Sequence, residues 1–138
     1  MPEPTSDPSP DARAQLLAEI YGHALDDPLT YPTGVAISGR LRLARRVGNE
    51  TEVARSITPL VEPFVADPAM IPNAGPCLAV GCFADELAEI TNDARHRDLI
   101  PSLADRLETD PDVRVEDFFF AGTLLGRAFA ITGDDRYA

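Results

Sequence analysis

The sequence repeats one short pattern three times, and this repeat constrains the fold more than any other feature. Its copies are Val47-Gly48-Asn49-Glu50, Ile90-Thr91-Asn92-Asp93 and Ile131-Thr132-Gly133-Asp134. They begin 43 and then 41 residues apart, and each follows an apolar run with helical spacing. The sixth residue after each copy begins is Val53, His96 or Tyr137. A period of this length is typical of arrays of helical hairpins, so we expect an all-α fold.

The apolar positions predict the helices that precede and flank the first turn. A first helix begins at Ser9-Pro10-Asp11, where a cap, a proline and an acid favour a helix start. Its apolar residues extend to Leu25, and Asp26-Asp27-Pro28 ends it. Residues 31–34, Tyr-Pro-Thr-Gly, form a loop, and the first hairpin begins near Val35.

Proline limits the second helix of the first hairpin. This helix begins near Thr51, but Pro59 and Pro63 lie within its apolar pattern. An interior proline costs a helix about 3 kcal/mol. We therefore expect a kink or an early end near Ile57.

The second and third hairpins follow the same pattern. The second consists of a helix over residues 75–90 and a helix over residues 95–107, which tolerates Pro101 only near its start. The third begins at Asp117, and its apolar residues surround the helix on nearly every side. Such a helix is buried all round, so we expect an inner helix.

The sequence contains no partner for this third helix before it ends at Ala138. We therefore expect an incomplete array of about two and a half hairpins, either a fragment of a longer protein or a chain covered by another chain. Left uncovered, the helix would expose a row of phenylalanine and leucine side chains.

The composition excludes several classes of partner and site. The formal net charge is -11, and phosphate binding needs a basic face, so we expect neither nucleic acid nor an anionic membrane surface as a partner. Residues 68–84, the longest uncharged run, contain prolines and turn residues and are not a membrane span. Cys77 and Cys82 do not share a helix face, so we expect two buried thiols, no disulfide and no metal site.

The N-terminal segment MPEPTSDPSP is acidic and rich in proline. It lacks the basic and apolar regions of a secretory signal. We expect a disordered leader over residues 1–10, one helical domain over residues 11–138, and a cytoplasmic location.

The third repeat is similar to a stretch of the six-hairpin glycosidases. Residues 114–122, Arg-Val-Glu-Asp-Phe-Phe-Phe-Ala-Gly, and residues 124–137, which end in Thr-Gly-Asp-Asp-Arg-Tyr, resemble glycoside hydrolase families 88 and 105. Those families are the unsaturated glucuronyl and unsaturated rhamnogalacturonyl hydrolases. Residues 73–79 and 87–93 resemble the preceding hairpin of the same group. The resemblance covers about residues 34–138 and implies an incomplete (α/α)6 toroid, since six such hairpins need roughly 250 residues.

The resemblance implies a site at the head of the third helix. Enzymes of this group use an Asp to protonate the C4–C5 double bond of a terminal unsaturated uronic acid. Water then adds at C5, and the resulting hemiketal breaks down to release the next sugar. Asp117 matches the acid, and Asn73, Arg114 and Phe118 would contact the oligosaccharide. A carboxyl group at the mouth of an apolar site gains proton affinity through desolvation, which suits an acid at neutral pH. No metal or cofactor is implied.

Simpler roles remain open for these residues. Asp117 is also a good N-cap, and Phe118 suits a core. Arg40 and Arg42 are alternatives to Arg114 as partners for a substrate carboxylate.

The sequence also departs from the family pattern. Met70, Ile71 and Pro72 stand where the family places a second Asp, and the loop over residues 108–115 is short. His96 fits a packing position and His23 a solvated one, so a triad based on histidine has little support.

Two functions from different classes follow. The first is a carbohydrate-active hydrolase, present as a fragment without its full active site. The second is a non-catalytic helical-repeat module that self-associates through the open apolar edge of the helix from Phe118 to Ile131. A sugar epimerase is a third possibility, but the sequence lacks a histidine acid/base pair for it.

Overall fold

All regular structure in the described residues is helical, which confirms the predicted all-α class. The computed structural model describes residues 7–26, 29–109 and 115–138. Its α-helices are α1 (Pro10–Ile20), α2 (Tyr31–Val47), α3 (Glu50–Ala66), α4 (Ala84–Thr91), α5 (Ala94–Thr109) and α6 (Val115–Thr132). Its 3-10 segments are η1 (Pro68–Met70), η2 (Gly75–Cys82) and η3 (Asp135–Tyr137). Part of the predicted leader, residues 1–6, lies outside the described residues, and Pro10 belongs to α1.

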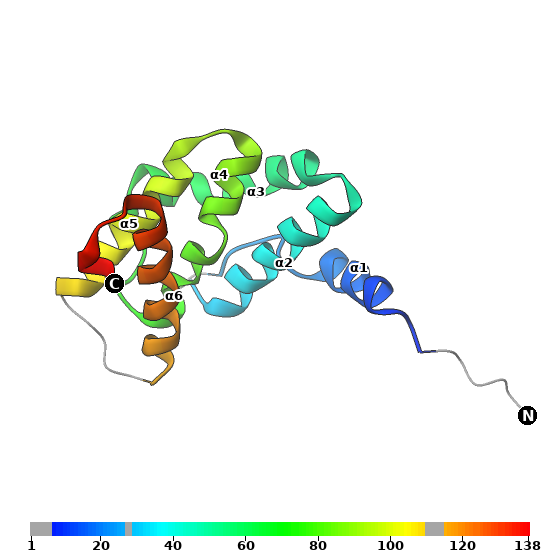
Figure 1. Ribbon diagram of the computed structural model, residues 1–138. Helices are drawn as coiled ribbons and strands as arrows, with labels where there is room; N and C mark the ends of the chain where they lie inside the picture. The colour runs from blue at the N-terminus through cyan, green and yellow to red at the C-terminus, as the bar shows by residue number, and fades with distance from the viewer. Residues whose placement is uncertain (1–6, 27–28, 110–114) are drawn as a thin grey trace, which may run out of the picture.

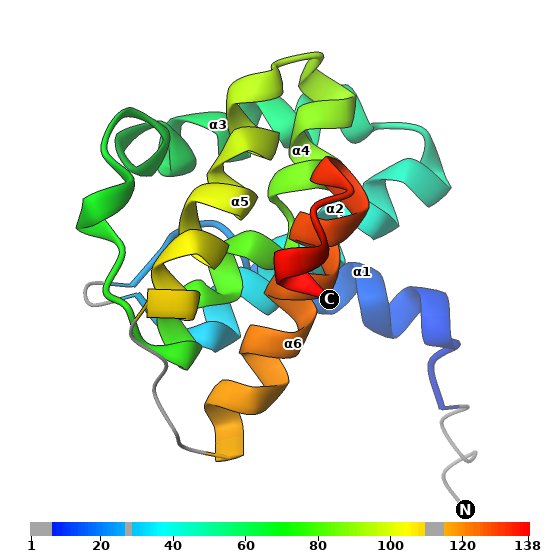
Figure 2. The ribbon, with the colours of Figure 1, turned by 60° about the vertical axis from the view of Figure 1, so that its left-hand side comes forward.

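The helices pack as successive antiparallel hairpins. α2 packs on α3, α4 packs on α5, and α6 packs on both α5 and η2. η2 also packs on α2, so this thin segment lies between α2 and α6. α1 lies against α2 at one edge of the molecule, on the opposite side from α5 (Figure 1, Figure 2).

The three repeated turns have the same backbone conformation. α2, α4 and α6 each end at a residue with positive φ, namely Gly48 (82°), Asn92 (55°) and Gly133 (68°). Glycine and asparagine tolerate this left-handed conformation best, which explains their place in the repeat. The residue that follows lies at the N-cap of the next helix. Asp93 and Asp134 accept a backbone N–H there, whereas Asn49 makes no side-chain capping bond.

The first turn is shifted by one residue relative to the sequence alignment. Its left-handed residue, Gly48, is the second of its motif, whereas Asn92 and Gly133 are the third of theirs. Val53 is therefore not the structural equivalent of His96 and Tyr137. Both of these are buried, whereas Val53 is half-buried.

Two predicted boundaries near the N-terminus were wrong. α1 does begin at the predicted cap, where Ser9 accepts the backbone N–H of Ala12, but it ends at Ile20. Gly22 then turns the chain with a φ of 77° and lies so close to α2 that a Cβ atom there would approach Ala36 to 2.9 Å. Residues 31–34 are the first turn of α2 and not a loop, because proline at the start of a helix loses no intrahelical hydrogen bond.

The predicted early end of α3 near Ile57 was also wrong, since α3 continues to Ala66. Pro59 and Pro63 lie four residues apart on its exposed face, where water can bind the carbonyl groups that lack a helical donor. The opposite face buries Ala54, Ile57 and Val61 in the core. Pro101 likewise lies well inside α5 and not near its start.

The predicted helix over residues 75–90 is divided into η2 and α4. Phe83, which is fully buried, separates the two segments with a φ of -134° and a ψ of -4°. η2 lies against α6 so closely that a Cβ atom at Gly81 would come within 2.6 Å of Leu124 Cδ1.

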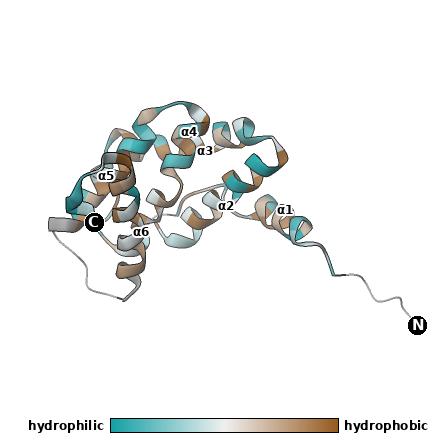
Figure 3. Cartoon of the chain, in the orientation of Figure 1, coloured by the Kyte–Doolittle hydropathy of each residue, from teal (hydrophilic) through white to brown (hydrophobic). Residues whose placement is uncertain are grey.

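α6 is not buried on every side, contrary to the sequence prediction. Phe120, Leu124 and Ala128 face the core, but Phe118 and Phe119 are 72% and 73% exposed. Figure 3 shows that hydrophobic residues dominate this helix. The uncovered face follows from its neighbours, because η2 and α5 cover only one side of α6.

Candidate functional site

A hollow of about 400 Å³ lies where α2, η2 and α6 begin. Figure 2 shows the first residues of α2 and α6 on the same side of the molecule. The hollow is lined by Tyr31, Val35, Pro76, Phe119 and Phe120. Each of the three elements therefore contributes residues from near its N-terminal end.

Three aromatic rings form one wall of the hollow. The rings of Tyr31 and Phe120 have centroids 5.5 Å apart and are inclined by 38°. Phe119 meets Phe120 edge to face, also at 5.5 Å. Tyr31 is 49% exposed, so its ring is accessible to a ligand while Phe120 supports it from the core. An aromatic surface of this kind can stack against the apolar face of a sugar or another flat group.

The N-terminal end of α2 lies at the hollow. The first turn of α2 contains no acid, and its N-cap residue, Thr30, makes no side-chain capping bond. Thr30 instead donates its hydroxyl to Asp26 Oδ2 at 2.6 Å. The N-terminal end of a helix carries partial positive charge and favours an anionic group. The start of α2 therefore adds a partial positive charge beside the hollow, next to the carboxylate of Asp26.

The proposed acid lies beside this hollow along the chain. Asp117 is the third residue of α6 and precedes Phe119 by two positions. The side chain of Asp117 and the whole of Arg114 lie outside the described part of the chain. Phe118 is described and points away from the core, as its exposure shows. The structure therefore brings Tyr31 and Phe119 together, which the sequence analysis had not connected.

Asn73 has a structural contact in this fold. Its side-chain amide donates to the carbonyl of Arg106 at 3.4 Å, and the Arg106 guanidinium donates to the carbonyls of Pro68 and Ile71 at 3.0 and 2.7 Å. Hydrogen bonds in both directions thus connect the segment before η2 to α5. A role for Asn73 in binding a substrate remains a prediction.

The two alternative cations also have partners within the fold. Arg40 donates to the carbonyl of Gly22, and its burial lowers the pKa of the guanidinium. Arg42 pairs with Glu86 at 2.7 Å, and this hydrogen bond raises the pKa of Arg42. Neither residue lines the hollow.

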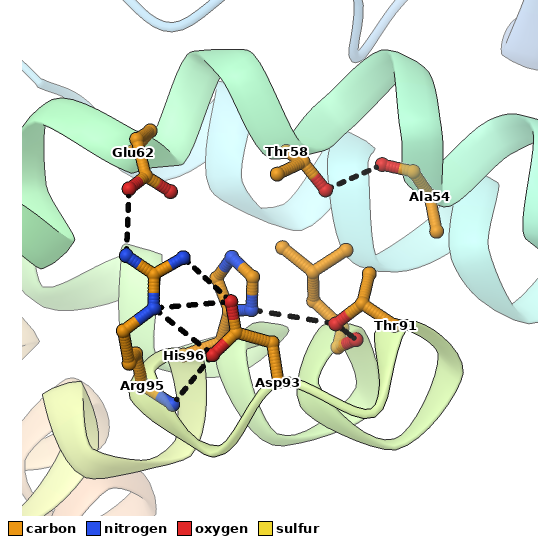
Figure 4. Close-up of polar contacts among 8 residues, drawn as sticks. Ala54, Thr58, Glu62, Thr91, Asp93, Arg95 and His96 are labelled. Atoms are coloured by element: carbon orange, nitrogen blue, oxygen red, sulfur yellow. Dashed lines mark hydrogen bonds and ion pairs between the residues drawn. The ribbon is translucent and has the colours of Figure 1, made fainter.

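His96 is buried as predicted, and its ring lies beneath α3 (Figure 4). Thr91 donates its hydroxyl proton to the carbonyl of Leu87 at 2.7 Å, so its oxygen can only accept from His96 Nδ1 at 3.4 Å. In this contact Nδ1 is therefore the donor. Nε2 has no hydrogen-bond partner among the described residues.

His23 is exposed, as predicted. Its Nε2 donates to the carbonyl of Ala18 at 2.9 Å.

The two cysteines are free thiols, with Cys77 buried and Cys82 half-buried. Cys77 donates to the carbonyl of Leu29, and burial raises the pKa of both thiols, which makes them poor nucleophiles.

Two other features concern the described residues as a whole. They contain no group of three or more His, Cys, Asp or Glu side chains placed to hold a metal ion. No described helix combines the length and apolar character needed to cross a membrane.

Comparison with models of known protein families, with curated proteins and with solved structures found no match to this chain.

Proposed function

We propose that this chain is part of a carbohydrate-active hydrolase that binds the unsaturated uronic acid at the end of an oligosaccharide. The observation that supports this proposal is the aromatic hollow at the joint N-terminal ends of α2, η2 and α6. The hairpin order would then continue into a closed α/α toroid, and the hollow would be one side of its substrate cleft.

The hollow offers a separate interaction to each part of such a sugar. The rings of Tyr31 and Phe119 stack on the apolar face of the pyranose ring. The acid-free start of α2 favours the sugar carboxylate through its partial positive charge. Asp117, at the head of α6, then acts as the proton donor.

The chemistry consists of a hydration followed by a spontaneous cleavage. Asp117 transfers its proton to C4 of the double bond, and water adds at C5 as the carboxylate takes a proton back. The product is a hemiketal, whose ring opens and releases the neighbouring sugar. Hydration uses the water and the carboxyl group, and ring opening then leaves a hemiacetal at C1 that breaks down without further catalysis.

The binding part of the proposal is tested with a mixed pool of unsaturated uronic disaccharides, titrated into the isotopically labelled chain and followed by NMR. We expect shifted resonances at Tyr31 and Phe119, and weaker binding in Tyr31→Leu and Phe119→Leu. The matched control is Phe129→Leu, because Phe129 is an exposed residue of α6 that does not line the hollow.

The catalytic part is tested by the loss of ultraviolet absorbance from the C4–C5 double bond. Activity that disappears in Asp117→Asn and persists in Glu116→Gln would support Asp117 as the acid. Binding without absorbance loss would support the sugar site and contradict catalysis by this chain alone. If the chain shows no binding and no absorbance loss, the result contradicts the proposal and favours the non-catalytic module.

A further inference from the structure

The uncovered face of α6 has a regular composition. It consists of two phenylalanines, two glycines, a third phenylalanine and an alanine, namely Phe118, Phe119, Gly122, Gly126, Phe129 and Ala130. At 3.6 residues per turn these six positions form one continuous arc, and all six are exposed. We call this surface the glycine face.

The backbone of the glycine face is open to close approach. A Cβ atom added at Gly122 or Gly126 would meet no atom within 4 Å. These glycines therefore serve no packing purpose inside the chain, and each weakens α6 relative to alanine. Gly81 is different, because packing inside the chain requires a glycine there: Leu124 occupies the space that a Cβ atom would need.

The glycine face carries no charge although the chain is strongly acidic. Within residues 118–132, Arg127 is the one charged residue, and its guanidinium turns inward to pair with Asp85 of α4. Two copies of this chain can thus meet over residues 118–132 without bringing like charges together within that stretch, despite a net charge of -11 on each.

The order of large and small residues makes the glycine face complementary to itself. When two copies of α6 lie antiparallel about a two-fold axis between positions 122 and 126, Gly122 meets Gly126 of the second copy. Phe118 then meets Phe129, and Phe119 lies over Ala130. A parallel pair would instead crowd all four leading phenylalanines at one end. From this register we infer that the glycine face binds a second copy of this chain, forming an antiparallel two-fold dimer.

The size of the face indicates a weak dimer. Phe118, Phe119 and Phe129 together expose about 370 Å² per copy, taking roughly 200 Å² for a whole phenylalanine. The phenylalanines of both copies thus fall short of the ~1,200 Å² at the lower end of stable interfaces. We expect a dimer that dissociates in the micromolar range. Phe119 belongs both to the glycine face and to the hollow, so dimer formation and sugar binding would compete for this ring.

The dimer is tested by sedimentation velocity of the full chain from low micromolar to near-millimolar concentration. We expect a monomer–dimer equilibrium in the wild type and a monomer at all concentrations in Gly126→Leu. The added side chain enters open space within one copy, so the variant keeps its fold, which circular dichroism verifies. Gly39→Leu, the same change at an exposed helical glycine of α2 with equal room, should leave the dimer intact.

Disulfide trapping tests the antiparallel register. We expect a mixture of Gly122→Cys and Gly126→Cys chains to form the mixed cross-link faster than either chain cross-links with itself. Faster self-cross-linking would contradict the antiparallel arrangement. A wild type that stays monomeric, a dimer that survives Gly126→Leu, or growth beyond dimers would each overturn the inference.

Discussion

Arg95 of α5 joins its own turn to Glu62 of α3, with Nη1 2.8 Å from Glu62 Oε1. The same guanidinium lies 2.7 Å from Asp93, the residue that caps α5 (Figure 4). One repeat later, Arg136 pairs with its cap residue, Asp134, at 3.0 Å and with Asp105 of α5 at 2.9 Å. Two of the three repeated turns are therefore fixed by the same Asp-x-Arg bridge to the second helix of the preceding hairpin.

The Asp93 bridge should make stability depend on acid pH. Hydrogen bonds from Arg95 hold the pKa of Asp93 below its ordinary value of 3.8. The unfolded chain binds this proton more readily, so the contribution is present above pH 3.8 and is lost as the pH falls through the lowered pKa. We expect Asp93→Asn to reduce the loss of stability on acidification, measured as urea midpoints at several pH values. Asp98→Asn, an exposed acid of α5, should leave the pH dependence close to that of the wild type.

Tyr137 should contribute to stability through its hydroxyl. This group donates to Asp105 and accepts from Arg136 Nη2 at 2.6 Å, while the ring is buried. We expect Tyr137→Phe to lower the free energy of unfolding by about 1–3 kcal/mol in chemical denaturation, because the hydroxyl makes two hydrogen bonds and one of them is to a carboxylate. Tyr21→Phe, at an exposed tyrosine, should change it little. Equal effects from both changes would contradict a specific role for the Tyr137 hydroxyl.

His96 should be replaceable by an apolar residue without loss. Among the described residues its buried Nε2 has no hydrogen-bond partner, and the contact between Nδ1 and Thr91 is long at 3.4 Å. We expect His96→Leu to raise the free energy of unfolding by up to about 1 kcal/mol, because the buried unpaired nitrogen disappears. Thr91→Val should lower it, since His96 Nδ1 then also loses its acceptor. A large destabilisation by His96→Leu in thermal unfolding would show that Nε2 does have a partner.

Gly81 should resist enlargement more than any exposed helical glycine. Its missing Cβ would lie 2.6 Å from Leu124 Cδ1, so alanine must push η2 and α6 apart. We expect Gly81→Ala to cost about 1–3 kcal/mol of stability. Gly39→Ala, where the added methyl group meets nothing, should be neutral or slightly stabilising in the same denaturation experiment.

The turns could be predicted from the sequence because their cause is local. Left-handed backbone at Gly48, Asn92 and Gly133 depends on residue type, and an aspartate that follows caps the next helix. The pattern located all three turns, but it did not reveal that the left-handed residue of the first turn comes one position earlier than in the other two. Burial of His96 also followed from its place in the repeat.

The course of α3 could not be predicted, because it depends on which face of the helix meets solvent. Pro59 and Pro63 are acceptable only because the fold turns both of them outward. The open face of α6 has a similar origin, since an apolar sequence does not tell which of its sides has a neighbour. The course of α3 and the open face of α6 are both determined by how segments distant in the sequence pack together.

The hollow could not be predicted from the sequence for a related reason. The sequence Tyr-Pro-Thr-Gly at residues 31–34 is typical of a loop, but a proline at its second position is equally typical of a helix start. Its contact with Phe120, far along the chain, appears only once η2 has brought α2 and α6 together.

η2 acts as a spacer whose thickness and length set the distance between two aromatic walls. A 3-10 helix is narrower than an α-helix, so α2 and α6 can approach it from either side until Tyr31 and Phe120 touch. With three residues per turn, one inserted residue would rotate all that follows by about 120° and carry Val80 out of the core. This short segment should therefore tolerate changes of side chain at its surface but no change in its number of residues.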